Sequence, residues 1–62
     1  MRFTTAVRQI PHDASAEYYS GSVYECFMDA VAPLCKVALV ESMVIPAKES
    51  NWIVVVAMGE LK

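Results

Sequence analysis

Residues 36–58 have the sequence KVALVESMVIPAKESNWIVVVAM, and this stretch decides the fold. Its two apolar runs, 36–45 and 52–58, contain most of the β-branched residues of the chain, and such residues favour pleated strands. The residues between the two runs are mostly polar and begin with Pro46, which has no backbone N–H to donate to a neighbouring strand. We therefore predict a β-hairpin.

Both faces of the last strand of this hairpin are apolar. In the second run, alternate residues form two apolar sets, Trp52, Val54, Val56 and Met58 on one face and Ile53, Val55 and Ala57 on the other. In the first run, one face takes Val37, Leu39, Glu41, Met43 and Ile45, and the other takes Ala38, Val40, Ser42 and Val44. A strand that is apolar on both sides is typical of a strand covered on both sides. We therefore expect a cover on each face of the last strand.

Residues 2–10, RFTTAVRQI, predict a further strand, which ends at Pro11. One of its faces carries Phe3, Thr5 and Val7. The other face carries Arg2, Thr4, Ala6, Arg8 and Ile10. Because of its two arginines, we expect this second face to be the more water-tolerant one.

A helix is predicted from Ser22 to about Ala32. The four residues from Ser22 to Glu25 match a capping box, in which the Ser and Glu side chains satisfy backbone N–H groups of the first turn. Apolar residues then recur at intervals of three and four, at Val23, Cys26, Phe27, Ala30, Val31 and Leu34. Pro33 disfavours helical geometry at the residue before it and should end the helix. Residues 12–21 show no such period and are predicted to be a loop.

The order strand, helix, strand, strand predicts an α+β fold, a single small domain over residues 1–62 with one helix packed on a three-stranded sheet. A right-handed crossover through the helix is expected to place the first strand parallel to a neighbour. The first strand can pair with either strand of the hairpin. We favour residues 52–58 as the central strand because they are the most apolar.

One short helix covers only one face of such a sheet, so the other face is left open. A chain of 62 residues buries only about 60% of the surface that its unfolded form exposes. Because 56% of the residues are hydrophobic, we expect association to stabilise the fold. We consider three occupants of the open face: a second copy in a homodimer, another protein, or residues 12–21 folded over it.

No catalytic, cofactor or metal site is predicted. His12 and Asp13 are adjacent in the sequence, whereas a catalytic His needs an orienting partner across the fold and a nucleophile within reach. Cys26 lies on the apolar stripe, where a thiol behaves as a small hydrophobic group. One His and two Cys lack the spacing of zinc ligands, and the two glycines do not form a phosphate-binding loop. We therefore expect a protein that is not an enzyme.

The two cysteines and the N-terminal sequence favour the cytoplasm. Cys26 and Cys35 are separated by nine positions, roughly 13 Å along a helix, which is too far for a disulfide. Free thiols favour a reducing compartment. Residues 1–10 lack a signal-peptide core, and the longest apolar run, Trp52–Met58, is too short to cross a bilayer.

The chain is slightly acidic, with five basic and seven acidic residues and a net charge of −2. It has no basic patch with interleaved aromatic residues, which argues against direct binding of nucleic acid. Between Gln9 and Cys35 every charged residue is acidic. This run is either a solvated face or a contact surface for a basic protein, with the neighbouring tyrosines as anchors. The candidate partner-binding residues are therefore Asp13, Glu17, Tyr18, Tyr19, Glu25 and Asp29.

The predicted helix SVYECFMDAVAPL, followed at once by the hairpin KVALVESMVIPAKESNWIVVVAM, resembles the small βαββ proteins of bacteriophages, including some of the anti-CRISPR type. The resemblance is one of architecture and covers about three-fifths of the chain. It implies an inhibitor that occupies the surface of another protein, such as a basic nucleic-acid-binding complex. In that case the four acidic residues would be the contacts and the two tyrosines the anchors.

Overall fold

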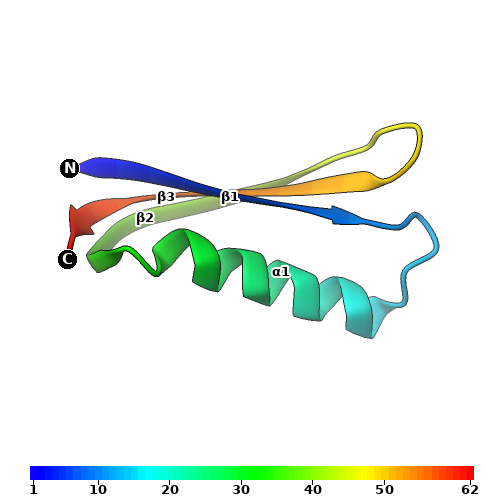
Figure 1. The fold of residues 1–62 in the computed structure, drawn as a ribbon, viewed down its shortest axis with the longest axis horizontal. Coiled ribbons are helices and arrows are strands. Elements are labelled where there is room, and N and C mark those ends of the chain that lie inside the picture. Colours follow the sequence, from blue (N-terminus) through cyan, green and yellow to red (C-terminus); the bar gives the residue numbers. More distant parts are fainter.

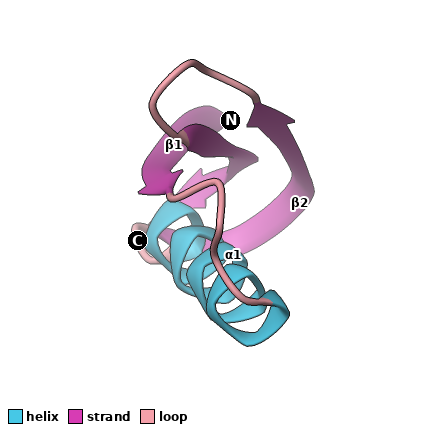
Figure 2. Ribbon diagram, turned by 90° about the vertical axis from the view of Figure 1, so that its right-hand side faces the viewer, coloured by secondary structure: helices cyan, strands magenta, loops and turns pink.

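The computed structural model describes residues 1–62, which form one helix and three strands. Strand β1 spans Arg2–Ile10, helix α1 Ala16–Val31, strand β2 Leu34–Ile45 and strand β3 Asn51–Leu61. The strands form one antiparallel sheet, and α1 lies along one face of it (Figures 1 and 2). The predicted α+β class, the element order and the packing of one helix on a three-stranded sheet are confirmed.

Strand β3 is central, as its apolar sequence predicts, and the sheet order is β1-β3-β2. It pairs antiparallel with all of β1 and, across two register shifts, with β2. The prediction that the first strand runs parallel to a neighbour is wrong. Strands β1 and β2 do point the same way, but the hairpin turns the chain back so that β3 lies between them and runs opposite to both.

Helix α1 begins earlier than predicted, at Ala16. Ser15 is its N-cap, because the Ser15 Oγ accepts a hydrogen bond from the backbone N–H of Tyr18 at 3.1 Å. Ser22 lies inside the helix, so the predicted capping box does not start it, and the predicted loop is wrong for its helical part. The C-terminal end agrees with the prediction from Pro33, since the last helical residue is Val31.

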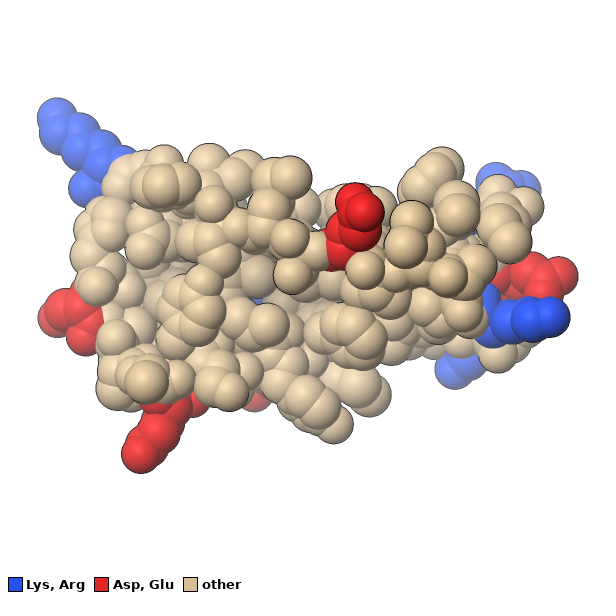
Figure 3. All heavy atoms as spheres, turned by 180° about the vertical axis from the view of Figure 1, so that it is seen from behind, with Lys and Arg blue, Asp and Glu red and all other residues tan.

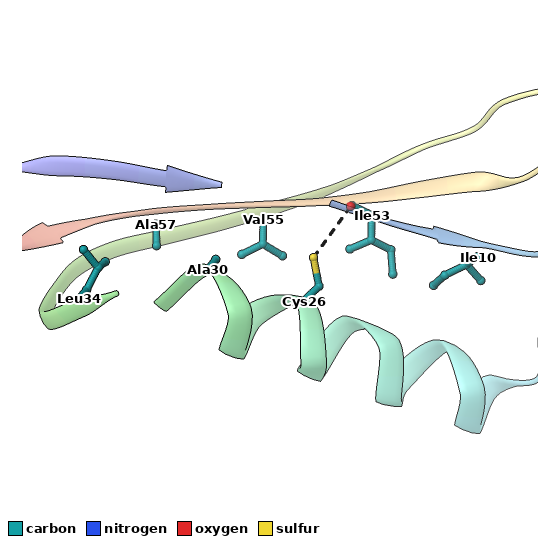
Figure 4. Close-up of a cluster of buried hydrophobic side chains, with 7 residues drawn as sticks. All are labelled: Ile10, Cys26, Ala30, Leu34, Ile53, Val55 and Ala57. Carbon is teal, nitrogen blue, oxygen red and sulfur yellow. Dashed lines mark hydrogen bonds between the residues drawn. The ribbon is translucent and has the colours of Figure 1, made fainter. Parts of the chain in front are cut away.

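The core lies between α1 and the half of the sheet formed by β1 and β3. It consists of seven buried residues, shown in Figure 4: Ile10, Cys26, Ala30, Leu34, Ile53, Val55 and Ala57. The two helical members, Cys26 and Ala30, have small side chains, which lets the helix axis come close to the sheet. The helix contacts β1 and β3 far more than it contacts β2.

The side of β1 that faces the helix is the one expected to tolerate water. Ile10 is buried and Ala6 packs against the core, whereas Phe3 on the other side is 72% exposed. The prediction fails because two polar groups on this side have partners on the helix, while Arg2 is exposed and the Arg8 Nε is buried without a partner. The Thr4 hydroxyl donates to the carbonyl of Ala30, and the Arg8 guanidinium donates to Asp29. A polar group with a hydrogen-bond partner can lie under a helix at little cost.

Candidate protein-binding surfaces

The face of the sheet away from α1 is defined by the alternation of side chains along the strands. In Figure 4 the side chains of Ile53, Val55 and Ala57 point toward the helix, so the residues between them point away from it. The register joins these outward residues into four rows, Phe3–Met58–Leu39, Thr5–Val56–Glu41, Val7–Val54–Met43 and Gln9–Trp52–Ile45. We call these twelve residues the open face.

The open face is apolar and largely uncovered. Its largest exposed members lie on the outer strands, with Phe3 72%, Met43 58% and Leu39 49% exposed, whereas its β3 residues are half-buried between their neighbours. Residues 12–21 do not fold over it, because they connect the end of β1 to α1 on the opposite side and form the first turns of that helix (Figure 1). That possible cover is therefore excluded.

A single charged side chain, Glu41, lies on the open face. It lines a shallow hollow of about 170 Å³ together with Ser42, Met43, Val54 and Val56. The view from behind in Figure 3 shows the wider distribution of charge, with acidic and basic side chains gathered toward the two ends of the long molecule and few between them. A partner on the open face would therefore meet apolar side chains and one carboxylate.

Strand β2 is a second uncovered element, since it forms one edge of the sheet. Val44 and Ile45 are adjacent and so point to opposite faces, yet they are 42% and 45% exposed. Both faces of β2 are thus open to solvent at this end. An edge strand of this kind also presents unpaired backbone N–H and C=O groups.

The predicted acidic surface is partly neutralised by Arg8 of β1. Its guanidinium lies 2.9 Å from the Glu25 carboxylate and 3.0 Å from the Asp29 carboxylate. The hydrogen bond to Asp29 raises the pKa of Arg8 above its ordinary value, and the charge of Glu25 adds to the effect. The acids were predicted to form either a solvated face or a contact surface for a basic protein, and the alternation of β1, which puts Arg8 on the same side as Ile10, is the sequence signal that reveals this partner. Asp13 and Glu17 are exposed and form no ion pair.

The two predicted tyrosine anchors have different environments. Tyr18 is 55% exposed in the first turn of α1, close to Glu17. Tyr19 is half-buried and packs against the core. Glu17 and Tyr18 are therefore both exposed at the start of the helix, whereas Tyr19 packs against the core.

His12, Cys26 and Cys35, which were considered for catalysis or metal binding, make separate contacts. The His12 Nε2 lies 3.2 Å from the carbonyl oxygen of Lys48, which links the two loops at one end of the sheet. Cys26 is buried, its thiol points toward the carbonyl of Ile53 at 4.0 Å, and burial raises its pKa. Cys35 is exposed, and both thiols are free, as predicted. No three His, Cys, Asp or Glu side chains are grouped so that they could hold a metal ion.

Helix α1 is neither long nor apolar enough to cross a membrane. Comparison of the chain with protein-family models, with curated proteins and with solved structures gives no match.

Proposed function

We propose that the chain is a small, non-enzymatic protein-binding module that acts through the open face. The observation that carries the proposal is the exposure of large apolar side chains on a continuous sheet surface, with Phe3, Val7 and Met43 each about half exposed or more. Exposed apolar patches of several hundred Å² on soluble domains mark interaction sites. The free thiols of Cys26 and Cys35 support the cytoplasm as the compartment in which the module acts.

The open face supports this function better than the acidic surface does. Two of the four acids predicted as contacts already pair with Arg8, which leaves Asp13 and Glu17 as the free carboxylates near the start of α1. A basic groove needs several phosphate-like charges to be occupied firmly. The acids and Tyr18 are therefore proposed as secondary contacts at the rim of a complex rather than as its centre.

A capture experiment with two charge variants separates the two surfaces. The chain would be immobilised and exposed to extract from the cells that produce it, as wild type, as Val54→Lys on the open face and as Glu17→Lys at the helix start. We expect Val54→Lys to lose the captured protein and Glu17→Lys to retain it, because a Lys in the middle of an apolar interface loses its hydration without gaining a partner. Retention by Val54→Lys together with loss by Glu17→Lys would assign binding to the acidic surface.

Two narrower functions fit this module. In the first, suggested by the resemblance to phage proteins of the anti-CRISPR type, the module inhibits a host complex by covering its surface. The test is phage plating on bacteria with an active CRISPR system, where expression of the chain should restore plaques and Val54→Lys should not. In the second, the chain is a structural or assembly subunit that self-associates through the open face, and this function is favoured by the nearly uncharged character of that face.

A further inference from the structure

We infer that the occupant of the open face is a second copy of the chain, packed sheet against sheet about a two-fold axis that runs along β3. The inference rests on the proposed function, because it requires the open face to be a binding surface. It adds the identity of the partner and the orientation of the two copies. The result is a four-layer molecule with the two sheets inside and the two helices outside.

The area of the open face reaches the lower limit of a specific dimer interface. Strands about 4.8 Å apart and residues about 3.3 Å apart along each strand give its four rows a flat extent of roughly 14 by 27 Å. That is about 400 Å² before the relief of the exposed side chains is counted. Two copies would then bury on the order of 1,000 Å² in total, which is where specific interfaces begin.

The charge on the open face also fits a second copy. Glu41 is its single charged residue, so a partner surface must be apolar and must offer a hydrogen-bond donor or cation at one point only. The open face itself has this composition. Its other polar members are Thr5, in the same row as Glu41 on the opposite edge of the sheet, and Gln9.

The position of Glu41 selects the direction of the two-fold axis. An axis across the strands through its row would place the two Glu41 carboxylates directly opposite each other, which is unfavourable. An axis along β3 exchanges the two edges, so that each Glu41 lies opposite Thr5 of the second copy, whose hydroxyl can donate to it. Val54 and Val56 then meet their own copies at the centre. The backbones at the two Glu41 positions would be roughly 14 Å apart at the usual sheet separation of about 10 Å, so the two carboxylates do not face each other.

The first test is the mass in solution, measured by sedimentation over chain concentrations from micromolar to about 0.5 mM. We expect twice the monomer mass of 6.9 kDa. Val54→Lys should raise the dimer dissociation constant on the order of 100-fold, because it places a cation at the apolar centre. Val44→Lys is the matched control, since Val44 lies on β2 but on the other face, and it should leave the constant unchanged. If Val54→Lys fails to fold, the more exposed Met43→Lys in the same row replaces it.

The second test addresses the orientation. Thr5→Lys should tighten the dimer roughly fivefold by pairing with Glu41 of the second copy, and Thr5→Glu should weaken it by a similar factor. When either Thr5 variant is combined with Glu41→Lys, the effect on dimer affinity should reverse, so that Thr5→Glu gives the tighter dimer and Thr5→Lys the weaker one. Thr5 and Glu41 of one copy also influence each other across β3, and this effect is measured separately as unfolding stability in the monomeric Val54→Lys background.

Each remaining outcome overturns the inference. A wild-type chain that stays monomeric at 0.5 mM has no second copy on its open face, while the proposed function still stands if the capture experiment finds a partner that Val54→Lys loses. A dimer that withstands both Val54→Lys and Met43→Lys uses a different surface, and then the open face fails for both proposals. A dimer broken by these variants but indifferent to Thr5 charge has a different axis.

Discussion

Gly59 is the glycine at which the structure predicts a large effect of a single added methyl group. A Cβ built on Gly59 would lie 1.9 Å from the carbonyl oxygen of Lys36, with the carbonyl carbon of Lys36 and the Cα of Val37 at 3.0 and 3.1 Å. All three atoms belong to the backbone of β2, next to a register shift in the β2–β3 pairing. Ordinary contact begins at 3.4 Å, so Gly59→Ala must push the β2 backbone away by about 1.5 Å.

This displacement sets the expected magnitude. Inserting atoms into a packed site costs about 1–3 kcal/mol, and here the displaced atoms are backbone rather than a side chain that can rotate. We therefore expect Gly59→Ala to lower the free energy of unfolding by about 2–4 kcal/mol. A domain of this size has only about 3–9 kcal/mol in total, so the variant should be partly unfolded at 37 °C.

The other glycine provides a matched control. Gly21 lies within α1, its φ is not positive, and a Cβ there would meet no atom within 4 Å. Gly21→Ala should therefore raise the free energy of unfolding by about 0.5–1 kcal/mol, because alanine restricts the unfolded chain and favours the helix. Urea unfolding followed by circular dichroism, at one fixed chain concentration, measures both variants. Equal stability of wild type and Gly59→Ala would refute the close approach of β2 to β3 at this position.

Four further predictions concern the helix cap, the thiols and the ion pairs. Ser15→Ala should cost about 1 kcal/mol of unfolding free energy, and Ser22→Ala less than about 0.5 kcal/mol, with the reverse order indicating a helix that starts at Ser22. Ellman's reagent should label Cys35 at once and Cys26 only through unfolding. Burial raises the pKa of the Cys26 thiol above its ordinary value of 9.0. The free energy of unfolding should therefore keep the full contribution of the protonated thiol below that pH and lose it as the pH rises further. Cys26→Ala should not show this loss. Arg8→Met should lower the thermal midpoint slightly in low salt and not at all in 1 M NaCl, since its pairs are exposed to screening.

The hairpin and the central strand follow from sequence because their signal is local. Residues 52–58 are apolar on both faces, and in the structure Ile53, Val55 and Ala57 are buried under the helix while Trp52, Val54 and Val56 line the open face. Two-sided apolarity is what a central strand between two covers requires. The same pattern predicted that one helix would leave one face uncovered.

The start of the helix was not predicted correctly from sequence, because the capping box at Ser22 is a local signal and the use of Ser15 depends on distance. Strand β1 carries the chain about 30 Å along the sheet, and the helix must return most of that length before β2 begins beside β3. A helix of ten residues from Ser22 would span only about 15 Å, whereas the 16 residues from Ala16 span about 24 Å. The length of the crossover therefore requires the earlier cap, Ser15. That length becomes known only when the strand order is known.

The candidate site was predicted only in part, and the rest was missed for a similar reason. The sequence places four acids in a run that contains no Lys or Arg, but Arg8 reaches Glu25 and Asp29 from a strand more than fifteen residues earlier. From composition alone, the Arg-bearing side of β1 was expected to be the more water-tolerant one. The helix acids make that side suitable for burial, because they provide partners for the guanidinium.

Stability and association should be coupled in this molecule. Only eight of its 62 residues are buried, and the open face is a continuous apolar surface that remains uncovered. A partner that binds the folded chain but not the unfolded chain stabilises the fold by about 2.7 kcal/mol when the partner's concentration is 100 times the dissociation constant. For a domain of this size, that free energy corresponds to a rise of roughly 10–20 °C in the unfolding midpoint.

A second copy as the partner makes this rise depend on the concentration of the chain itself. The thermal midpoint of the wild type, measured by circular dichroism, should therefore increase steadily between about 5 μM and 500 μM chain, by several degrees for each tenfold step. Val54→Lys should have the same midpoint at every concentration, and Val44→Lys should behave like the wild type. A wild-type midpoint that does not move would mean that the folded chain is stable alone with its open face in water, and another protein would then have to be the occupant.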